Sequence, residues 1–114
     1  MAEHEWVEEF KGAVIVTDEN GTILEMNERA IKNLKDDGGR ALLGTNVLDC
    51  HPEPSKTKLK EIMAERRTNV YTIEKRGVKK LIFQAPWTRD GRYRGLIEVS
   101  LEIPFEMPHF VRKS

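Results

Sequence analysis

Polar and apolar residues alternate in short stretches over much of the chain. In LIEVSLEI, Ile97, Val99 and Leu101 would lie on one side of a strand and Glu98 and Ser100 on the other. A period of two residues is typical of a half-buried β-strand. The same pattern, together with β-branched content, predicts strands at residues 13-17, 22-26, 69-75, 78-87 and 94-103.

The connections between these stretches predict how the strands pair. Asp-Glu-Asn-Gly separates the first two, Arg76-Gly77 the third and fourth, and Asp90-Gly91 the last two. Short turns that contain glycine join antiparallel neighbours. We therefore expect an antiparallel sheet without a parallel pair.

Helical spacing of apolar residues marks the segments outside these strands. Near the start, Trp6, Val7 and Phe10 would lie on one side of a short acidic helix. A second helix is predicted after Asn27, whose side chain would cap it.

A third helix is predicted to begin at Ser55, which would cap it. It carries an apolar stripe formed by Leu59, Ile62 and Met63. Two strands, then helices, then three strands indicate an α+β domain with an antiparallel sheet.

The length and charge of the chain restrict its function. At 114 residues it is large enough for one hydrophobic core and too small for two. Lys+Arg and Asp+Glu both number 19, so the formal charge is zero and we expect no nucleic-acid or membrane partner. A single cysteine cannot form an internal disulfide, which favours a cytoplasmic location. The sequence has no paired Cys or His spacing of the kind that holds zinc.

Three segments carry motifs that resemble one known family. VTDENGTILEMNERA combines a strand, an Asp-x-x-Gly turn, a second strand and a helix-capping Asn, and this order resembles the opening of the PAS domain family. LLGTNVLD resembles the segment before its ligand-side helix, and QAPWTRDGRYRGLIEVSLEI resembles its closing hairpin. The resemblance implies a PAS-like five-stranded antiparallel sheet with helices on one face, enclosing a pocket. We expect an amphipathic helix at 1-11, the PAS domain at 12-103 and a tail at 104-114.

The segment LDCHPEPSK places the only cysteine, Cys50, beside His51. Flavin photosensors of the family carry a cysteine where this sequence has Val47, which argues against flavin. Haem-binding members have a similar Pro-Glu-Pro or Cys-His-Pro-Pro segment, but their iron-ligating histidines fall at Leu59 and Thr57 here. His51 would therefore be the only histidine available to hold the haem iron.

The second axial position of such a haem would fall to Met63 or Cys50. In a structural role, His51 would instead buttress the helix start while Cys50 packs as a small hydrophobe. In a third role, His51 would bind a polar group of an organic ligand. A Cys-His nucleophilic dyad is disfavoured because adjacent side chains seldom point at one another. We therefore predict a non-enzymatic protein.

The predicted ligand site lies between the Ser55 helix and the inner face of the sheet, with His51 at its mouth. Its candidate residues are His51, Cys50, Leu59, Ile62, Met63, Phe83, Val99 and Leu101. The first hypothesis is a stand-alone sensory and signalling module that binds a small apolar or amphipathic ligand. The alternatives are a haem sensor of gas or redox state through His51, and a structural dimerisation domain without a ligand.

The first helix predicts self-association. Trp6, Val7 and Phe10 need burial, and an amphipathic segment this short is marginal alone. We therefore predict a homodimer through this helix and the exposed sheet face. Because only residues 104-114 follow the last strand, we expect output to pass through an unidentified signalling partner or a change in dimerisation.

Overall fold

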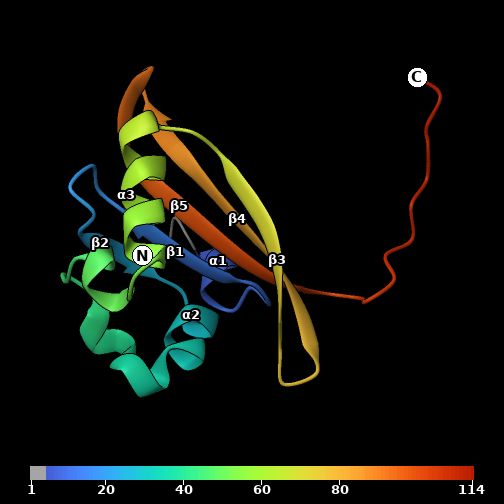
Figure 1. The fold of residues 1–114 in the computed structure, drawn as a ribbon, viewed down its shortest axis with the longest axis horizontal. Coiled ribbons are helices and arrows are strands. Elements are labelled where there is room, and N and C mark those ends of the chain that lie inside the picture. The colour runs from blue at the N-terminus through green and yellow to red at the C-terminus, as the bar shows by residue number, and fades with distance from the viewer. Residues whose placement is uncertain (1–4) are drawn as a thin grey trace.

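Five antiparallel strands form one sheet in the computed structural model, which describes residues 5–114 (Figure 1). They are β1 (Ala13–Thr17), β2 (Ile23–Met26), β3 (Asn69–Lys75), β4 (Val78–Arg89) and β5 (Arg92–Ile103). Their spatial order is β2-β1-β5-β4-β3, and neighbouring strands are antiparallel throughout. The predicted strands, their pairing and the α+β fold class are confirmed.

The helices lie on both sides of this sheet, and not on one face as the resemblance to PAS domains implies. They are α1 (Glu5–Glu8), α2 (Glu28–Asn33) and α3 (Ser55–Glu65), with short 3-10 turns at Lys35–Asp37, Gly39–Leu42 and Val47–Cys50. In Figure 1, α2 and α3 lie in front of the sheet and α1 lies behind it. Residues 1–4 of the N-terminal helix predicted at 1-11 lie outside the described residues. No helix within residues 5–114 is long and apolar enough to span a membrane.

Asn27 joins β1, α1 and α2 through its side chain. Its Oδ1 accepts hydrogen bonds from the Ala30 amide at 3.1 Å and the Val14 amide at 2.9 Å. Its Nδ2 donates to the carbonyls of Gly12 at 2.8 Å and Val7 at 2.9 Å. Since the side chain is only 3% exposed, these bonds offset the cost of burying an amide. The predicted capping role of Asn27 is confirmed.

The core lies between the sheet and helices α2 and α3. One cluster, around α2, is formed by Ala13, Ile23, Met26, Ala30 and Leu42. A second cluster packs Leu59 and Ile62 of α3 on Leu96 of β5, with Met63 at its edge. The apolar stripe predicted on the third helix therefore faces the sheet.

Leu96 packs on α3 and therefore marks the inward side of β5. The Leu96 backbone N–H donates a hydrogen bond to Thr17 Oγ1 of β1 at 3.2 Å. The preceding Gly95 crosses β1 so closely that a Cβ there would overlap the Thr17 carbonyl oxygen. The Trp87 indole donates to that same oxygen at 2.9 Å. With Leu96 inward, alternation turns every odd-numbered residue from Ile97 to Leu101 to the opposite face.

We call the side of the sheet toward α3 the inner face and the opposite side the outer face. The inner face of β4 and β5 carries Ile82, Gln84, Leu96, Glu98 and Ser100, as their pairing and the position of Leu96 require. The outer face carries Val14, Val16, Phe83, Ile97, Val99 and Leu101. The expectation that Phe83, Val99 and Leu101 face the pocket beside α3 is therefore wrong, because the strand phase turns them outward.

Candidate functional site

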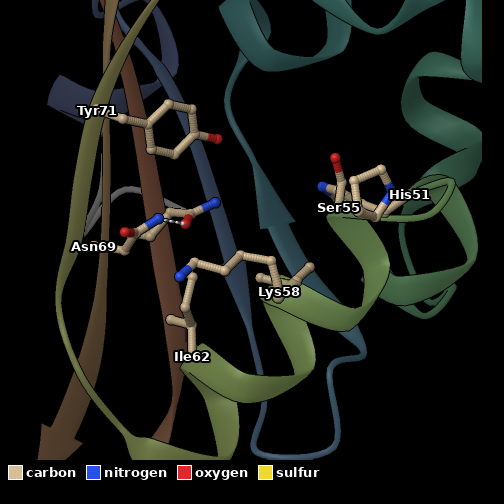
Figure 2. Close-up of a pocket in the computed structure, with 9 residues that line it drawn as sticks. His51, Ser55, Lys58, Ile62, Asn69 and Tyr71 are labelled. Carbon is tan, nitrogen blue, oxygen red and sulfur yellow. Dashed lines mark hydrogen bonds between the residues drawn. The ribbon is translucent and has the colours of Figure 1, made fainter.

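A cleft of about 530 Å³ opens between α3 and the inner face of β3 and β4 (Figure 2). It exists because α3 packs on β5 through Leu96, so that β4 and the edge strand β3 extend beyond the helix. The lining residues are His51, Pro54, Ser55, Lys58, Leu59, Ile62, Asn69, Tyr71 and Gln84. Clefts of this volume commonly hold small organic molecules.

One wall of the cleft is apolar and rigidly held. Leu59 is 3% exposed and Ile62 is 1% exposed, and both belong to the cluster around Leu96. Pro54 extends this apolar wall at the start of α3. Lys58, on the same helix, extends toward the strands (Figure 2). The helix therefore offers a hydrophobic surface with one cation beside it.

The opposite wall is a chain of hydrogen-bonded polar side chains. Asn69 Nδ2 donates to Gln84 Oε1 at 3.0 Å, and Gln84 Nε2 donates to Glu98 Oε1 at 2.6 Å. A carboxylate only accepts, so Glu98 sets the orientation of the Gln84 amide, and Gln84 in turn sets that of Asn69. The second Gln84 N–H, the Asn69 oxygen and the second Glu98 oxygen keep further hydrogen-bonding capacity. This wall is suited to recognising a polar group.

Tyr71 adds a hydroxyl to the polar wall. Its ring extends from β3 with the hydroxyl toward α3 (Figure 2). Tyr71 is 43% exposed, and partial burial of its phenol, followed by the Glu98 carboxylate, raises the pKa of the phenol above its usual value. The hydroxyl therefore stays protonated at neutral pH and remains a hydrogen-bond donor.

His51 is one of the residues that line the cleft. Its Nδ1 is 2.8 Å from the Val47 carbonyl oxygen. Because a carbonyl only accepts, Nδ1 must carry the proton of this hydrogen bond, and Nε2 keeps a lone pair in the neutral ring. The bond to the turn Val47–Cys50 also holds the imidazole in one orientation. His51 thus combines a structural contact with a nitrogen that remains able to bind.

The start of α3 is capped by a residue other than the predicted Ser55. Glu53 accepts from the Thr57 amide at 2.9 Å and from the Thr57 hydroxyl at 2.7 Å. These two bonds lower the pKa of the Glu53 carboxyl below its usual value. Ser55 is the first residue of the helix, after Pro54, and instead lines the cleft. Its prediction as the cap is wrong because a glutamate further upstream reaches the same turn.

The structure brings together some of the predicted site residues and separates others. His51, Leu59 and Ile62 line the cleft. Met63 lies at the edge of the core and lines a different hollow, beside Tyr93. Cys50 is an exposed residue. Partial burial of its thiol, and then the nearby carboxylates of Asp37 and Asp49, raise the pKa of that thiol. A raised pKa disfavours the thiolate that a nucleophile or metal ligand requires.

Sequence reasoning missed five polar residues of the cleft, which are Ser55, Lys58, Asn69, Tyr71 and Gln84. Gln84 left a signal, since it interrupts the apolar run LIFQAPW. A glutamine in the middle of a strand that is otherwise apolar indicates a buried polar contact or a site. Tyr71 and Asn69 left none, because β3 is an edge strand in which polar residues are ordinary.

The residues of the cleft do not fit a haem well. His51 would supply one imidazole, but Met63 and Cys50, the predicted second ligands, do not line the cleft. The wall formed by Asn69 and Gln84 is polar, whereas a macrocycle of haem's size requires largely apolar walls.

Comparison with known proteins identifies the family. A family model of the PAS fold matches residues 4–96, and the chain belongs to the PAS family. No curated protein matches the chain.

Solved structures share the fold at low identity. A C-terminal domain from Streptococcus mutans is 16% identical with a TM-score of 0.70, over 85% of this chain and 79% of that chain. A sensory box sensor histidine kinase from Vibrio cholerae is 16% identical with a TM-score of 0.64, over 91% of both chains. The Aer2 receptor from Vibrio cholerae, described as a dual PAS-heme oxygen sensor, is 16% identical with a TM-score of 0.65, over 82% of this chain and 95% of that chain. At these identities the likeness establishes the fold and no ligand.

Proposed function

We propose that this PAS domain is a non-enzymatic sensory module that binds a small amphipathic organic molecule in the cleft beside α3. The observation that carries the proposal is the pairing of an apolar wall, Leu59 and Ile62, with a polar wall, Asn69 and Gln84. A ligand with an apolar body and a polar end satisfies both walls at once. His51 and Lys58 would contact its polar end at the mouth of the cleft.

The proposed ligand would bridge α3 and the strands β3 and β4, which have little direct contact with each other. The apolar contact of α3 is with β5, whereas the polar wall belongs to β3 and β4. Binding across the cleft would therefore favour conformations in which the edge strand β3 and α3 lie close together. A shift of this kind would change the conformation of the sheet, whose outer face is available to a partner.

We further propose that the signal leaves through a homodimer formed by α1 and the outer face. Trp6 is 73% exposed, and Phe83 is 41% exposed in the middle of the outer face. Apolar surface of this kind marks an interaction site. With its single cysteine, the protein would work in the reducing cytoplasm and pass the signal to a downstream protein.

The experiment compares His51→Ala with Cys50→Ser, a change at the neighbouring side chain outside the cleft. Native mass spectrometry of freshly purified protein measures any co-purifying molecule, and thermal shift against a panel of small carboxylates, amines and amphiphiles measures added ones. We expect His51→Ala to lose binding with an unchanged circular dichroism spectrum, and Cys50→Ser to bind as the original chain does. Equal binding by both variants would remove His51 from the site.

An absorption spectrum tests the alternatives in the same preparation. A Soret band after addition of haem, lost in His51→Ala, would support the haem sensor instead. A protein that stays colourless and binds nothing in the panel, yet dimerises, would support the structural dimerisation domain.

A further inference from the structure

A groove of about 340 Å³ lies between α1 and the outer face of β1 and β2. Its apolar lining comes from Trp6, Val7, Val14, Val16, Leu24, Met26, Leu43 and Ile97. Two carboxylates, those of Glu8 and Glu25, also line it, and both residues are exposed. The groove therefore suits a segment that ends in apolar side chains followed by positive charge.

The C-terminal tail, residues 104–114, has this composition. Phe105, Met107, Phe110 and Val111 are between 53% and 86% exposed, so the tail buries little of its apolar surface within its own chain. Arg112 and Lys113 follow directly, and the Arg112 guanidinium lies over the Phe110 ring at 5.4 Å. Figure 1 shows the tail leaving the sheet and running away from the domain.

We propose that residues 105–113 of a second copy of this chain occupy the groove. Phe110 and Val111 would enter between Trp6 and Leu24, and Arg112 and Lys113 would meet Glu8 and Glu25. Exchange of the two tails fills both grooves by one twofold operation and leaves no open contact for further copies. The inference rests on the proposed homodimer and names the segment that completes it.

The direction of the tail favours a second copy over the chain's own groove. The Phe105 carbonyl accepts a hydrogen bond from Lys79 Nζ of β4 at 3.5 Å. The tail thus leaves β5 on the side of β4, whereas the groove lies over β1 and β2 on the other side of β5. Pro104 and Pro108 restrict the backbone and disfavour a sharp return.

Cysteine cross-linking of two different chains tests the exchange. Both chains carry Cys50→Ser, one also carries Leu24→Cys in the groove, and the other Val111→Cys in the tail. Each chain then has one cysteine, so a disulfide between a groove and a tail forms only between two copies. We expect a covalent heterodimer on mild oxidation. A control mixture of Lys75→Cys, in the β3–β4 hairpin, with Val111→Cys should give at least about tenfold less.

Two further variants separate this inference from the dimer on which it rests. Phe110→Glu, in the otherwise unchanged chain, should weaken dimerisation about tenfold or more, as measured by light scattering over a dilution series. Arg112→Glu should weaken it less, and combination with Glu25→Arg should restore it. A Phe110→Glu chain with undiminished dimerisation would overturn the tail exchange and leave the dimer standing.

Three further outcomes would each overturn the proposed tail exchange. An original chain that stays monomeric at all concentrations would overturn both the dimer and the exchange. A Cys50→Ser chain with both Leu24→Cys and Val111→Cys that forms its disulfide internally as a monomer would place the tail in its own groove, against the proposal. Cross-linking no greater than in the Lys75→Cys control would overturn the exchange as well.

Discussion

The two faces of the β4–β5 hairpin contradict the usual distribution of polar and apolar residues. On the inner face, which α3 partly covers, Gln84 is 4% exposed and is hydrogen-bonded to Glu98. On the outer face, directly beside it in sequence, Phe83 is 41% exposed. A buried amide on the covered face and an exposed phenyl ring on the uncovered face each require an explanation beyond folding.

The two faces need different explanations, because burying a polar group and exposing an apolar one carry different free-energy costs. A buried amide is tolerated only when its hydrogen bonds are satisfied, and Gln84 achieves this through Asn69 and Glu98. Exposed apolar surface is relieved by contact with another molecule. Under the proposed function, the inner face would recognise a polar group and the outer face would associate with another molecule. The following changes test that division.

The largest effect is expected at the apolar wall of the inner side. Ile62→Ala should lower the free energy of unfolding by about 2 to 5 kcal/mol, because the side chain is 1% exposed and its removal leaves a cavity. Val70→Ala, on the half-exposed outer side of β3, should change it by less than about 0.5 kcal/mol. Urea unfolding measures both. Similar losses in the two variants would show that the outer face is part of the core.

The polar wall should contribute less and in a different way. Gln84→Leu leaves the Asn69 and Glu98 side chains without their partner and should cost about 1 to 3 kcal/mol. Combination with Glu98→Leu should recover part of this loss, because the acceptor is then removed together with its donor. A double variant whose loss equals the sum of the single losses would mean that the two side chains do not act as a unit.

The strands of this sheet could be predicted from the sequence because alternation and glycine turns are local signals. The sequence did not allow us to predict which face of the sheet packs on α3. In LIEVSLEI the apolar phase from Ile97 to Leu101 is the longer one, but the inward side chain is Leu96, one position earlier. The Leu96 side chain is inward because it packs on Leu59 and Ile62 of α3, which are far away in the sequence. Alternation shows that two faces differ and does not show which one is covered.

The cleft was predictable in part for a similar reason. His51, Leu59 and Ile62 were found because they belong to a helix and the loop before it, where spacing determines the face. Asn69, Tyr71 and Gln84 come from the strands, and they meet α3 only through the order β5-β4-β3 of the sheet. The volume between the helix and the edge strand follows from tertiary packing and leaves no sequence pattern.

The outer face should affect association and leave stability nearly unchanged. Phe83→Lys places a charge among the apolar side chains of this face and should weaken dimerisation about tenfold. Sedimentation over a dilution series measures the effect. The control is Thr72→Lys, on β3 nearer the hairpin, which removes no large apolar side chain and should weaken dimerisation less. If Phe83→Lys lowers the stability of the domain but leaves dimerisation unchanged, the proposed division of the two faces is wrong.

The smallest effect concerns Tyr71, the titratable hydroxyl of the inner face. Burial and the Glu98 carboxylate raise the pKa of its phenol in the folded state. Above pH of about 10 the unfolded chain loses the phenol proton while the folded chain retains it, so the folded state binds more protons and the free energy of unfolding falls as pH rises. Tyr71→Phe should make this alkaline decline less steep. Urea unfolding between pH 8 and roughly 11 measures the slope.

Tyr93 provides the comparison that makes this last measurement specific. Burial also raises the pKa of its phenol, with Arg66 opposing the shift, but Tyr93 lies outside the cleft beside Met63. Tyr93→Phe should therefore reduce the alkaline slope independently, and the two effects should add because the residues share no partner. Only Tyr71→Phe should also alter binding in the cleft, where its hydroxyl faces α3. An alkaline slope that is unchanged in Tyr71→Phe would place this phenol in water, and the polar wall would then end at Asn69 and Gln84.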